Sequence, residues 1–197
     1  MLADVSFEQE LTDFIRGRRL KFYDNRRSER RLDFVISFGA VLFHLEAKEK
    51  RQAINTQAWP TMQGVKEQDL FILDDLSARK ILRKAPFSGL VVRDNLLNRY
   101  IFYDVVTLML APRLRVNRAL NREDTILKGK WILDQRNGIV CLNLDEVFHY
   151  IDLYLQSQDQ IFEEEAACYG DFYGEYIGIG GRERTVEDHR ADYHATR

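Results

Sequence analysis

The segment from Arg31 to Lys48, RLDFVISFGAVLFHLEAK, constrains the fold more than any other part of the chain. It contains two short runs rich in apolar, β-branched and aromatic residues, which indicates two strands with both faces at least partly covered. The chain must reverse between these runs, and Gly39 can supply the positive φ of a two-residue type II′ turn. We therefore expect a β-hairpin that turns at Gly39 and Ala40.

The register of this hairpin brings charged side chains together. A turn at residues 39–40 puts Asp33 directly across from Glu46. Directly opposed residues on one sheet face have Cβ atoms roughly 4.5–5.5 Å apart, and like charges at this spacing are destabilising. Because side chains alternate between the faces of a strand, Lys48 shares the face of Glu46. Two carboxylates and an ammonium on one patch of an apolar hairpin do not favour stability, whereas a bound divalent metal ion would explain them.

The size and charge distribution of the chain set wider bounds. At 197 residues and 45% apolar content, the chain is expected to form one domain with a sizeable core. Residues 16–31 carry eight basic residues and two acidic ones, whereas residues 144–197 carry thirteen acidic residues and four arginines. This asymmetry suits a basic nucleic-acid-binding surface with an acidic tail, and it equally suits two solvated faces of opposite sign.

The cysteines and the hydropathy pattern bear on location. Cys141 and Cys168 are too few and too far apart for a disulfide framework or a zinc site, which favours a reduced, cytoplasmic setting. No charged segment precedes an apolar run at the N-terminus, and no stretch approaches 18 apolar residues. We therefore expect neither secretion nor membrane insertion.

The N-terminal half reads as alternating helices and strands. Ser6 can cap a first helix, whose apolar stripe includes Phe7 and Leu11. The elements expected here are a helix over residues 5–16, a strand over 19–24, the hairpin over 31–48, a helix over 50–63, a strand over 69–73, and a helix that begins at Asp74 or Asp75 and ends at Arg83.

The C-terminal half is expected to extend the same domain. Asn143 and Glu146 form a capping-box-like start to a long helix with an apolar stripe. Before it we expect a hairpin of strands over residues 89–94 and 99–112, a basic loop over 113–128 and a strand over 130–134. After it, residues 170–197 lose periodicity and are expected to form a flexible acidic tail.

The order of these elements resembles the core of the PD-(D/E)XK nuclease superfamily. That core has a helix with an acidic residue, three strands with Asp on the second and Glu-x-Lys on the third, then a helix and a strand. Residues 8–75 are most similar to archaeal Holliday-junction resolvases and their restriction-endonuclease-like relatives. The resemblance implies a mixed α/β fold, with a nuclease core over residues 1–85 and a β-hairpin and helical extension over residues 86–169.

The resemblance assigns roles to individual residues. Asp33 matches the strand aspartate, Glu46 the second acid and Lys48 the lysine, although Leu32 stands where many relatives have proline. The relatives also carry a helical Glu followed by apolar residues three and seven positions later. Glu8 fits this pattern and is matched to the helical acid. Glu10 does not fit it and is the second candidate for that role. Gln57 resembles a helix glutamine that some members use near the metal.

The chemistry implied is hydrolysis of a phosphodiester with Mg²⁺ or Mn²⁺. Mg²⁺ is usually bound by one or two carboxylates together with phosphate oxygens and waters. The ligands that the resemblance implies are Glu8, Asp33, Glu46 and the backbone carbonyl of Ala47. Lys48 would orient the attacking water or stabilise the transition-state charge.

The function expected from the sequence is that of a metal-dependent endonuclease acting on DNA, with RNA left open as a substrate. The alternative is a nuclease fold kept as a non-catalytic nucleic-acid-binding or assembly module. By analogy, a homodimer is expected because two strands must be cut. The residues expected to contact the phosphate backbone are Arg16, Arg18, Arg19, Lys21, Arg26, Arg27, Arg30, Arg31, Lys50 and Arg51.

Three isolated residues favour structural roles. His44 shares the face of Glu46, but a partly buried structural histidine is favoured over a ligand or a base. Trp59 and Trp131 are favoured as core or rim residues over base-stacking platforms.

Overall fold

The computed structural model describes residues 5–28, 30–119, 127–169, 175–176 and 183–184. The chain forms two compact units, residues 1–155 and residues 156–197. The first unit contains all of the predicted 1–85 core and most of the predicted 86–169 extension. As expected from the sequence, it is a mixed α/β structure built on a mixed sheet.

The described helices and strands follow one another in this order along the chain: α1 (Phe7–Gly17), β1 (Phe22–Asp24), β2 (Phe34–Phe38), β3 (Val41–Lys50), the 3₁₀ turn η1 (Glu67–Asp69), β4 (Leu70–Asp74), α2 (Asp75–Leu82), β5 (Ser88–Asp94), β6 (Arg99–Asp104), α3 (Val105–Leu110), β7 (Arg113–Ala119), β8 (Leu127–Asp134), the 3₁₀ turn η2 (Gln135–Asn137), β9 (Ile139–Cys141), α4 (Leu144–Tyr169), β10 (Glu175–Tyr176) and β11 (Glu183–Arg184).

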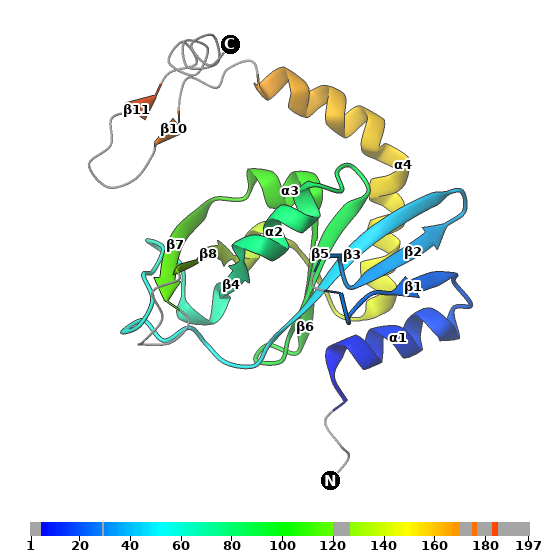
Figure 1. Ribbon diagram of the computed structural model, residues 1–197, viewed down its shortest axis with the longest axis horizontal. Coiled ribbons are helices and arrows are strands. Elements are labelled where there is room, and N and C mark those ends of the chain that lie inside the picture. The colour runs from blue at the N-terminus through cyan, green and yellow to red at the C-terminus, as the bar shows by residue number, and fades with distance from the viewer. Residues whose placement is uncertain (1–4, 29, 120–126, 170–174, 177–182, 185–197) are drawn as a thin grey trace. The chain divides into compact units, whose positions relative to one another are not determined.

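The main sheet of the first unit has six strands in the order β1-β2-β3-β5-β6-β9 (Figure 1). Strands β3 and β5 are its parallel pair, with Glu46 beside Leu90, and its other neighbouring strands are antiparallel. Parallel neighbours need a long crossover, which is formed by residues 51–87 and contains α2. The crossover places α2 over the middle of β3.

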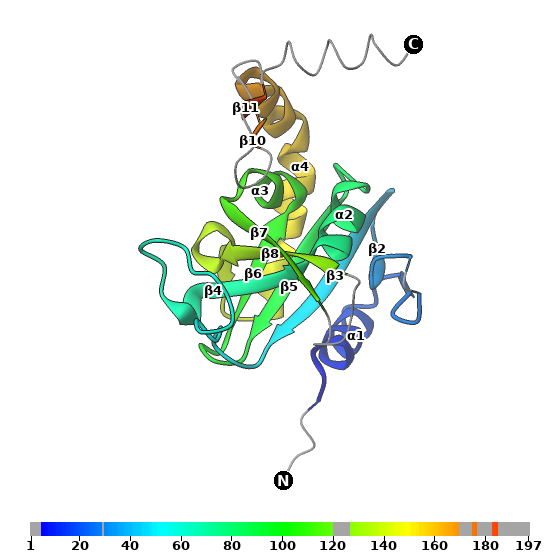
Figure 2. The same cartoon turned by 60° about the vertical axis from the view of Figure 1, so that its left-hand side comes forward.

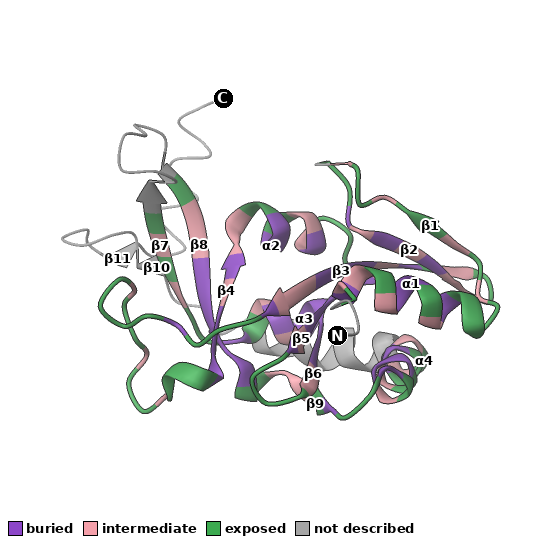
Figure 3. Ribbon diagram, turned by 90° about the horizontal axis from the view of Figure 1, so that it is seen from below, coloured by how far each residue is buried: buried purple, intermediate pink, exposed green. Residues whose placement is uncertain are grey.

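Helices cover both faces of the main sheet (Figure 3). On one face, the first half of α4 packs against α1 and the hairpin, because the ring of Phe148 lies 5.0 Å from that of Phe14 and 5.9 Å from that of Phe38. On the other face, α2 lies over β3, where Ser77 is hydrogen-bonded to Glu46. The Glu46 side chain of β3 therefore faces α2.

A second sheet has three strands in the order β4-β8-β7 (Figure 2). Strand β4 was expected over residues 69–73 and forms, but it pairs antiparallel with β8 and lies in this second sheet. A small separate core of Ile54, Leu70 and Ile132 supports it.

The predicted hairpin is confirmed together with its register. Phe34 pairs with Leu45 and Val35 with His44, as a turn at residues 39–40 requires. Gly39 has a φ of 61°, the positive value expected of it. The first helix begins as predicted, with the Ser6 side chain accepting a hydrogen bond from the N–H of Gln9 at 3.3 Å.

The helix predicted over residues 50–63 is wrong. Strand β3 continues to Lys50, and the following residues form turns up to η1. Pro60 cannot donate an intrahelical hydrogen bond. The side chain of Asn55 also competes with helix formation, because it accepts a hydrogen bond from the N–H of Gln57 at 3.0 Å.

Two predictions in the C-terminal half also need correction. The strand expected over residues 99–112 ends at Asp104, whose carboxylate caps α3 by accepting the Thr107 N–H at 2.8 Å. The basic loop expected over residues 113–128 instead contains β7 and the start of β8. Here Leu114 and Val116 are partly buried against the small core while Arg113 and Arg115 are exposed, which is the alternation of a strand.

The long helix is confirmed as α4, and Asn143 caps it by accepting the Glu146 N–H at 2.9 Å. The tail predicted over residues 170–197 lies outside the described residues, apart from the antiparallel pair β10–β11. Among the described residues, no helix is long and apolar enough to cross a membrane.

A candidate active site on the main sheet

Asp33, Glu46 and Lys48 meet on the face of the main sheet that α2 covers. Asp33 directly precedes β2, and its Oδ2 accepts the backbone N–H of Ala47 at 2.9 Å. The Nζ of Lys48 lies 2.7 Å from Glu46 Oε1 and 3.7 Å from Asp33 Oδ2. The structure thus brings together the three residues that the sequence singled out.

Helix α2 adds two side chains that the sequence analysis missed. Ser77 Oγ donates a hydrogen bond to Glu46 Oε1 at 2.7 Å, and Lys80 Nζ lies 3.8 Å from Glu46 Oε2. Residues three apart on a helix share one face, so the pairing of Ser77 with Lys80 was visible in the sequence. Their proximity to Glu46 was not, because it depends on the crossover between β3 and β5.

The two carboxylates have more positive charge beside them than the sequence had suggested. Two ammonium groups, those of Lys48 and Lys80, lie within 4 Å of Glu46 oxygens. The repulsion between Asp33 and Glu46 is real but partly compensated, so it no longer requires a metal ion as its explanation.

The electrostatics of the site affect two groups most clearly. Burial raises the pKa of Asp33, the nearby Glu46 carboxylate raises it further, and the Lys48 ammonium and the Ala47 N–H only partly oppose this. For Lys48, burial lowers the pKa, but the carboxylates of Glu46 and Asp33 outweigh it and leave the pKa above its usual value. Lys48 therefore stays protonated at neutral pH.

The donor set fits a magnesium-type ion. Glu46 is 1% exposed, and its buried Oε2 accepts no hydrogen bond from the described residues. A buried carboxylate oxygen of this kind has lost its water contacts and can bind a hard cation. Among the described residues, no three or more His, Cys, Asp or Glu side chains are arranged around one metal position. The site therefore offers Asp33 and Glu46, the one or two carboxylates that Mg²⁺ usually takes.

The two acids of α1 do not join this cluster as metal ligands among the described residues. The Glu8 and Asp33 carboxylates both help to raise the pKa of Arg26, after the larger effect of Asp24. Glu10 accepts hydrogen bonds from Arg93, at 2.5 Å, and from the Tyr100 hydroxyl. Glu10 therefore serves to fasten α1 to the sheet.

Gln57 does not lie on a helix over the site, because the predicted helix is absent. It is an exposed residue of a turn, and the helical residues beside Glu46 are Ser77 and Lys80 of α2.

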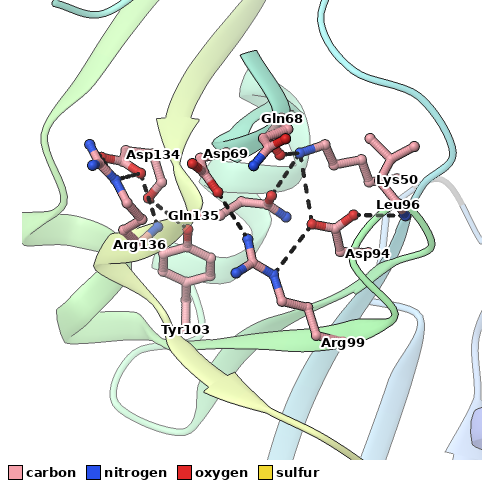
Figure 4. Close-up of polar contacts among 10 residues, drawn as sticks. All are labelled: Lys50, Gln68, Asp69, Asp94, Leu96, Arg99, Tyr103, Asp134, Gln135 and Arg136. Atoms are coloured by element: carbon pink, nitrogen blue, oxygen red, sulfur yellow. Dashed lines mark hydrogen bonds and ion pairs between the residues drawn. The ribbon is translucent and has the colours of Figure 1, made fainter. Parts of the chain in front are cut away.

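Lys50 was expected to contact a phosphate backbone, but the structure buries it and leaves it only 5% exposed. Its Nζ donates hydrogen bonds to Gln135 Oε1, at 2.7 Å, and to the carbonyl of Gln68 (Figure 4). It also lies 3.8 Å from Asp94, which Arg99 approaches from the other side. Lys50 thus joins the end of β3 to the second sheet.

The remaining predicted cations fall into two groups. Some are paired with an acid: Arg16 with Asp13, Arg18 with Asp145, Arg26 with Asp24 and Arg51 with Glu49. The others are exposed: Arg19, Lys21, Arg27, Arg30 and Arg31.

The isolated aromatic residues are structural, as expected. Trp131 is 6% exposed and donates its indole N–H to Asp75 at 2.9 Å. Trp59 packs against the small core of the second sheet.

No protein-family model matches this chain, and no curated protein matches its sequence.

Proposed function

We propose that this chain is a metal-dependent endonuclease that hydrolyses phosphodiester bonds of DNA on a restriction-endonuclease-like fold. The observation that carries the proposal is the meeting of Asp33, Glu46 and Lys48 on one sheet face, with a buried oxygen on Glu46 that accepts no hydrogen bond from the described residues. A metal ion held by two carboxylates can activate water for phosphodiester hydrolysis, and a nearby ammonium can stabilise the charge that develops.

The topology supports the same proposal. A helix (α1), three antiparallel strands (β1–β3), a helix (α2) and a strand parallel to the third (β5) follow in the order of the nuclease core that the sequence resembles. The last two of these elements are α2 and β5, in place of the segments 50–63 and 69–73 that the sequence analysis had put there. Residues 51–74 are then an insertion that carries β4 into the second sheet.

Each residue has a distinct task in this mechanism. Asp33 and Glu46 would hold Mg²⁺ or Mn²⁺, which supplies an activated water and neutralises charge on the scissile phosphate. Lys48, protonated and 32% exposed, can donate to the attacking water or to a phosphate oxygen. Ser77 and Lys80 keep the Glu46 carboxylate in one orientation through their contacts with its two oxygens.

Surface cations beside the site can hold the phosphates on either side of the cleaved bond. A cleft of about 650 Å³ between α2 and the β7–β8 strands is lined by the cations Arg79, Lys80, Arg115 and Lys128 and by the acids Asp74 and Asp75. Asp75 is ion-paired with Arg79 and Arg115. Contacts of this kind give affinity without sequence preference.

The test is cleavage of a panel of duplex, branched and single-stranded DNA and of RNA, with Mg²⁺ or Mn²⁺. Lys48→Met should reduce cleavage by about 10²–10³-fold, because one transition-state donor is typically worth that much. Glu46→Gln should also suppress cleavage, because it removes the charge of a metal-binding carboxylate. Lys66→Met and Glu67→Gln make the same chemical changes at exposed positions away from the site and should cleave normally.

Binding measured alongside cleavage separates the two classes of function. If the wild type binds nucleic acid but cleaves no member of the panel with either metal, the alternative of a non-catalytic nucleic-acid-binding module is supported. Normal cleavage by Lys48→Met would contradict the proposed roles.

A further inference from the structure

A cleft of about 530 Å³ lies next to the candidate active site, on the same sheet face. Tyr23, Val35 and His44 line it as one row across the sheet, because Tyr23 pairs with Val35 and Val35 with His44. Val35 and His44 each lie two residues along their strands from Asp33 and Glu46. Two strand residues span about 6.5 Å, so the cleft and the carboxylates occupy neighbouring rows.

The cleft and the site also share a side chain. Lys80 lines the cleft, and its Nζ lies 3.8 Å from Glu46 Oε2. Asn25 connects them on the other side, because it lines the cleft while its N–H donates to the carbonyl of Asp33 at 2.8 Å. A ligand in the cleft therefore lies against the residues proposed to act on the phosphodiester.

The lining combines a flat apolar floor with a positively charged rim. Tyr23 is 68% exposed, so its ring is open to a ligand. None of the described residues that line the cleft is acidic. The rim cations are Arg30, Arg31, Lys80, Arg83 and Lys84.

Most of these cations are available to a ligand. Arg30, Arg31, Arg83 and Lys84 are exposed, and none of them forms an ion pair with another described residue. Four exposed cations with no described acidic partner beside an open aromatic ring fit a ligand that has both a negative charge and a flat apolar part.

We propose that this cleft binds one nucleotide of the substrate strand next to the scissile phosphodiester, and that the base of this nucleotide is unpaired. The volume lies within the 300–1,000 Å³ of ordinary small-molecule sites. The base stacks on Tyr23 above Val35 and His44, and its phosphate contacts the rim cations. A base inside a duplex has neighbours on both faces, so it must leave the stack before it can reach the Tyr23 ring.

This proposal rests on the proposed endonuclease function and narrows its substrate. The enzyme is expected to act where a strand is locally unpaired, as in single strands, bulges, ends or branch points, in preference to continuous duplex. The sequence analysis did not include Tyr23, Arg83 or Lys84 among the residues that contact nucleic acid.

Binding without metal tests the cleft directly. The probe is a fluorescent single-stranded oligodeoxynucleotide in EDTA, compared with the duplex of the same sequence. The wild type should bind the single strand more tightly. Tyr23→Ala should weaken single-strand binding by about tenfold, the usual effect of losing one base–aromatic stack, and Tyr23→Phe should retain it. Leu142→Ala, at a position 73% exposed and outside the cleft lining, is the control and should bind as the wild type does.

The charged rim is tested in the same assay. Lys84→Gln should weaken binding and reduce the salt slope of the binding constant by about one, the effect of losing one phosphate contact. Lys66→Gln, at an exposed lysine outside the cleft, should change neither quantity. The proposal is overturned if Tyr23→Ala and Lys84→Gln both bind like their controls, or if the wild type binds duplex and single strand equally.

Cleavage then distinguishes failure of the two proposals. A wild type that cleaves no substrate, while Tyr23→Ala still loses single-strand binding, contradicts the endonuclease and supports the nucleotide cleft. A wild type that cleaves continuous duplex as fast as a duplex with one bulged nucleotide, with Tyr23→Ala equally active on both, supports the endonuclease and contradicts the cleft.

Discussion

Asp33 is the acid of the proposed machinery whose pKa the fold raises. Its side chain is 17% exposed, lies opposite Glu46 and has a raised pKa because of burial and that neighbouring charge. The sequence predicted this opposition from the turn at residues 39–40 alone, because a hairpin register is local. Ser77 and Lys80 could not be predicted in the same way, since their contact with Glu46 depends on distant parts of the chain.

Asp33→Asn should make the metal-free protein more stable, by about 0.2–1 kcal/mol on the cross-strand scale. The substitution removes one of two opposed charges, and the amide oxygen can still accept the Ala47 N–H. Lys48 keeps Glu46 as its partner at 2.7 Å. Melting curves with and without Mg²⁺ measure the effect, and Mg²⁺ should raise the melting temperature of the wild type alone.

The same variant should also change the pH dependence of stability. Because the pKa of Asp33 is higher in the folded than in the unfolded state, the folded protein binds the proton more tightly. The stability contributed by this group is complete below the usual aspartate pKa and is lost as pH rises through the raised value. Asp33→Asn has no carboxyl group at this position, so it should not lose this stability as the pH rises. If it is less stable than the wild type at neutral pH and gains as much from Mg²⁺, Asp33 is a structural residue.

The strands of the main sheet were easier to predict than the segments that connect them. The hairpin, β5, the start of β6 and the long helix α4 have strong apolar patterns and clear turn or cap signals. The helix predicted over residues 50–63 failed because its apolar residues, such as Trp59, pack on the small core from turns. The β7 strand was missed because its many charged residues are typical of a loop. Its strand structure depends on pairing with β8, which the local sequence does not show.

Two glycines give a matched test of packing within these elements. A Cβ on Gly89, the second residue of β5, would lie 2.7 Å from the backbone oxygen of Tyr103 and 3.1 Å from the Phe43 ring. Gly89→Ala should therefore destabilise the protein by about 1–3 kcal/mol. A Cβ on Gly17, the last residue of α1, would meet nothing within 4 Å. Gly17→Ala should be neutral or stabilising by about 0.4–1 kcal/mol, because it restricts the unfolded chain.

Chemical denaturation of both variants measures these two effects. Equal stability of Gly89→Ala and the wild type would mean that β5 and β6 can separate to admit a methyl group. The packing of the main sheet would then be looser than the described contacts indicate.

On the scale of the whole molecule, a buried charged cluster connects the two sheets. Lys50 of β3 and Asp94 of β5, from the main sheet, meet Gln135, which follows β8 of the second sheet. Asp94 is fully buried, and its Oδ2, like Gln135 Nε2, has no hydrogen-bond partner among the described residues. Burial lowers the pKa of Lys50, the Asp94 carboxylate opposes this, and the pKa stays below its usual value.

A double-mutant cycle measures how strongly this cluster couples the sheets. Lys50→Met should cost about 3–5 kcal/mol, because it leaves a buried carboxylate with less compensation. Lys50→Met combined with Asp94→Leu should cost less than the sum of the single changes, with a coupling energy of about 0.5–3 kcal/mol. Denaturant unfolding gives these values, and Lys66→Met serves as an exposed control. Strict additivity would mean that the two charges do not interact.

The parallel pairing of β3 with β5 also determines when the candidate site forms. Pairing these strands closes a loop of residues 51–87, and contacts that close long loops are slow to form. Glu46 therefore meets Ser77 late in folding, after the local β2–β3 hairpin is in place. Ser77→Ala removes a hydrogen bond worth about 1.5–3 kcal/mol to a carboxylate. In stopped-flow experiments this loss should accelerate unfolding and leave the refolding rate nearly unchanged. The lifetime of the folded protein, more than the speed of its folding, then depends on the contacts that α2 makes with β3.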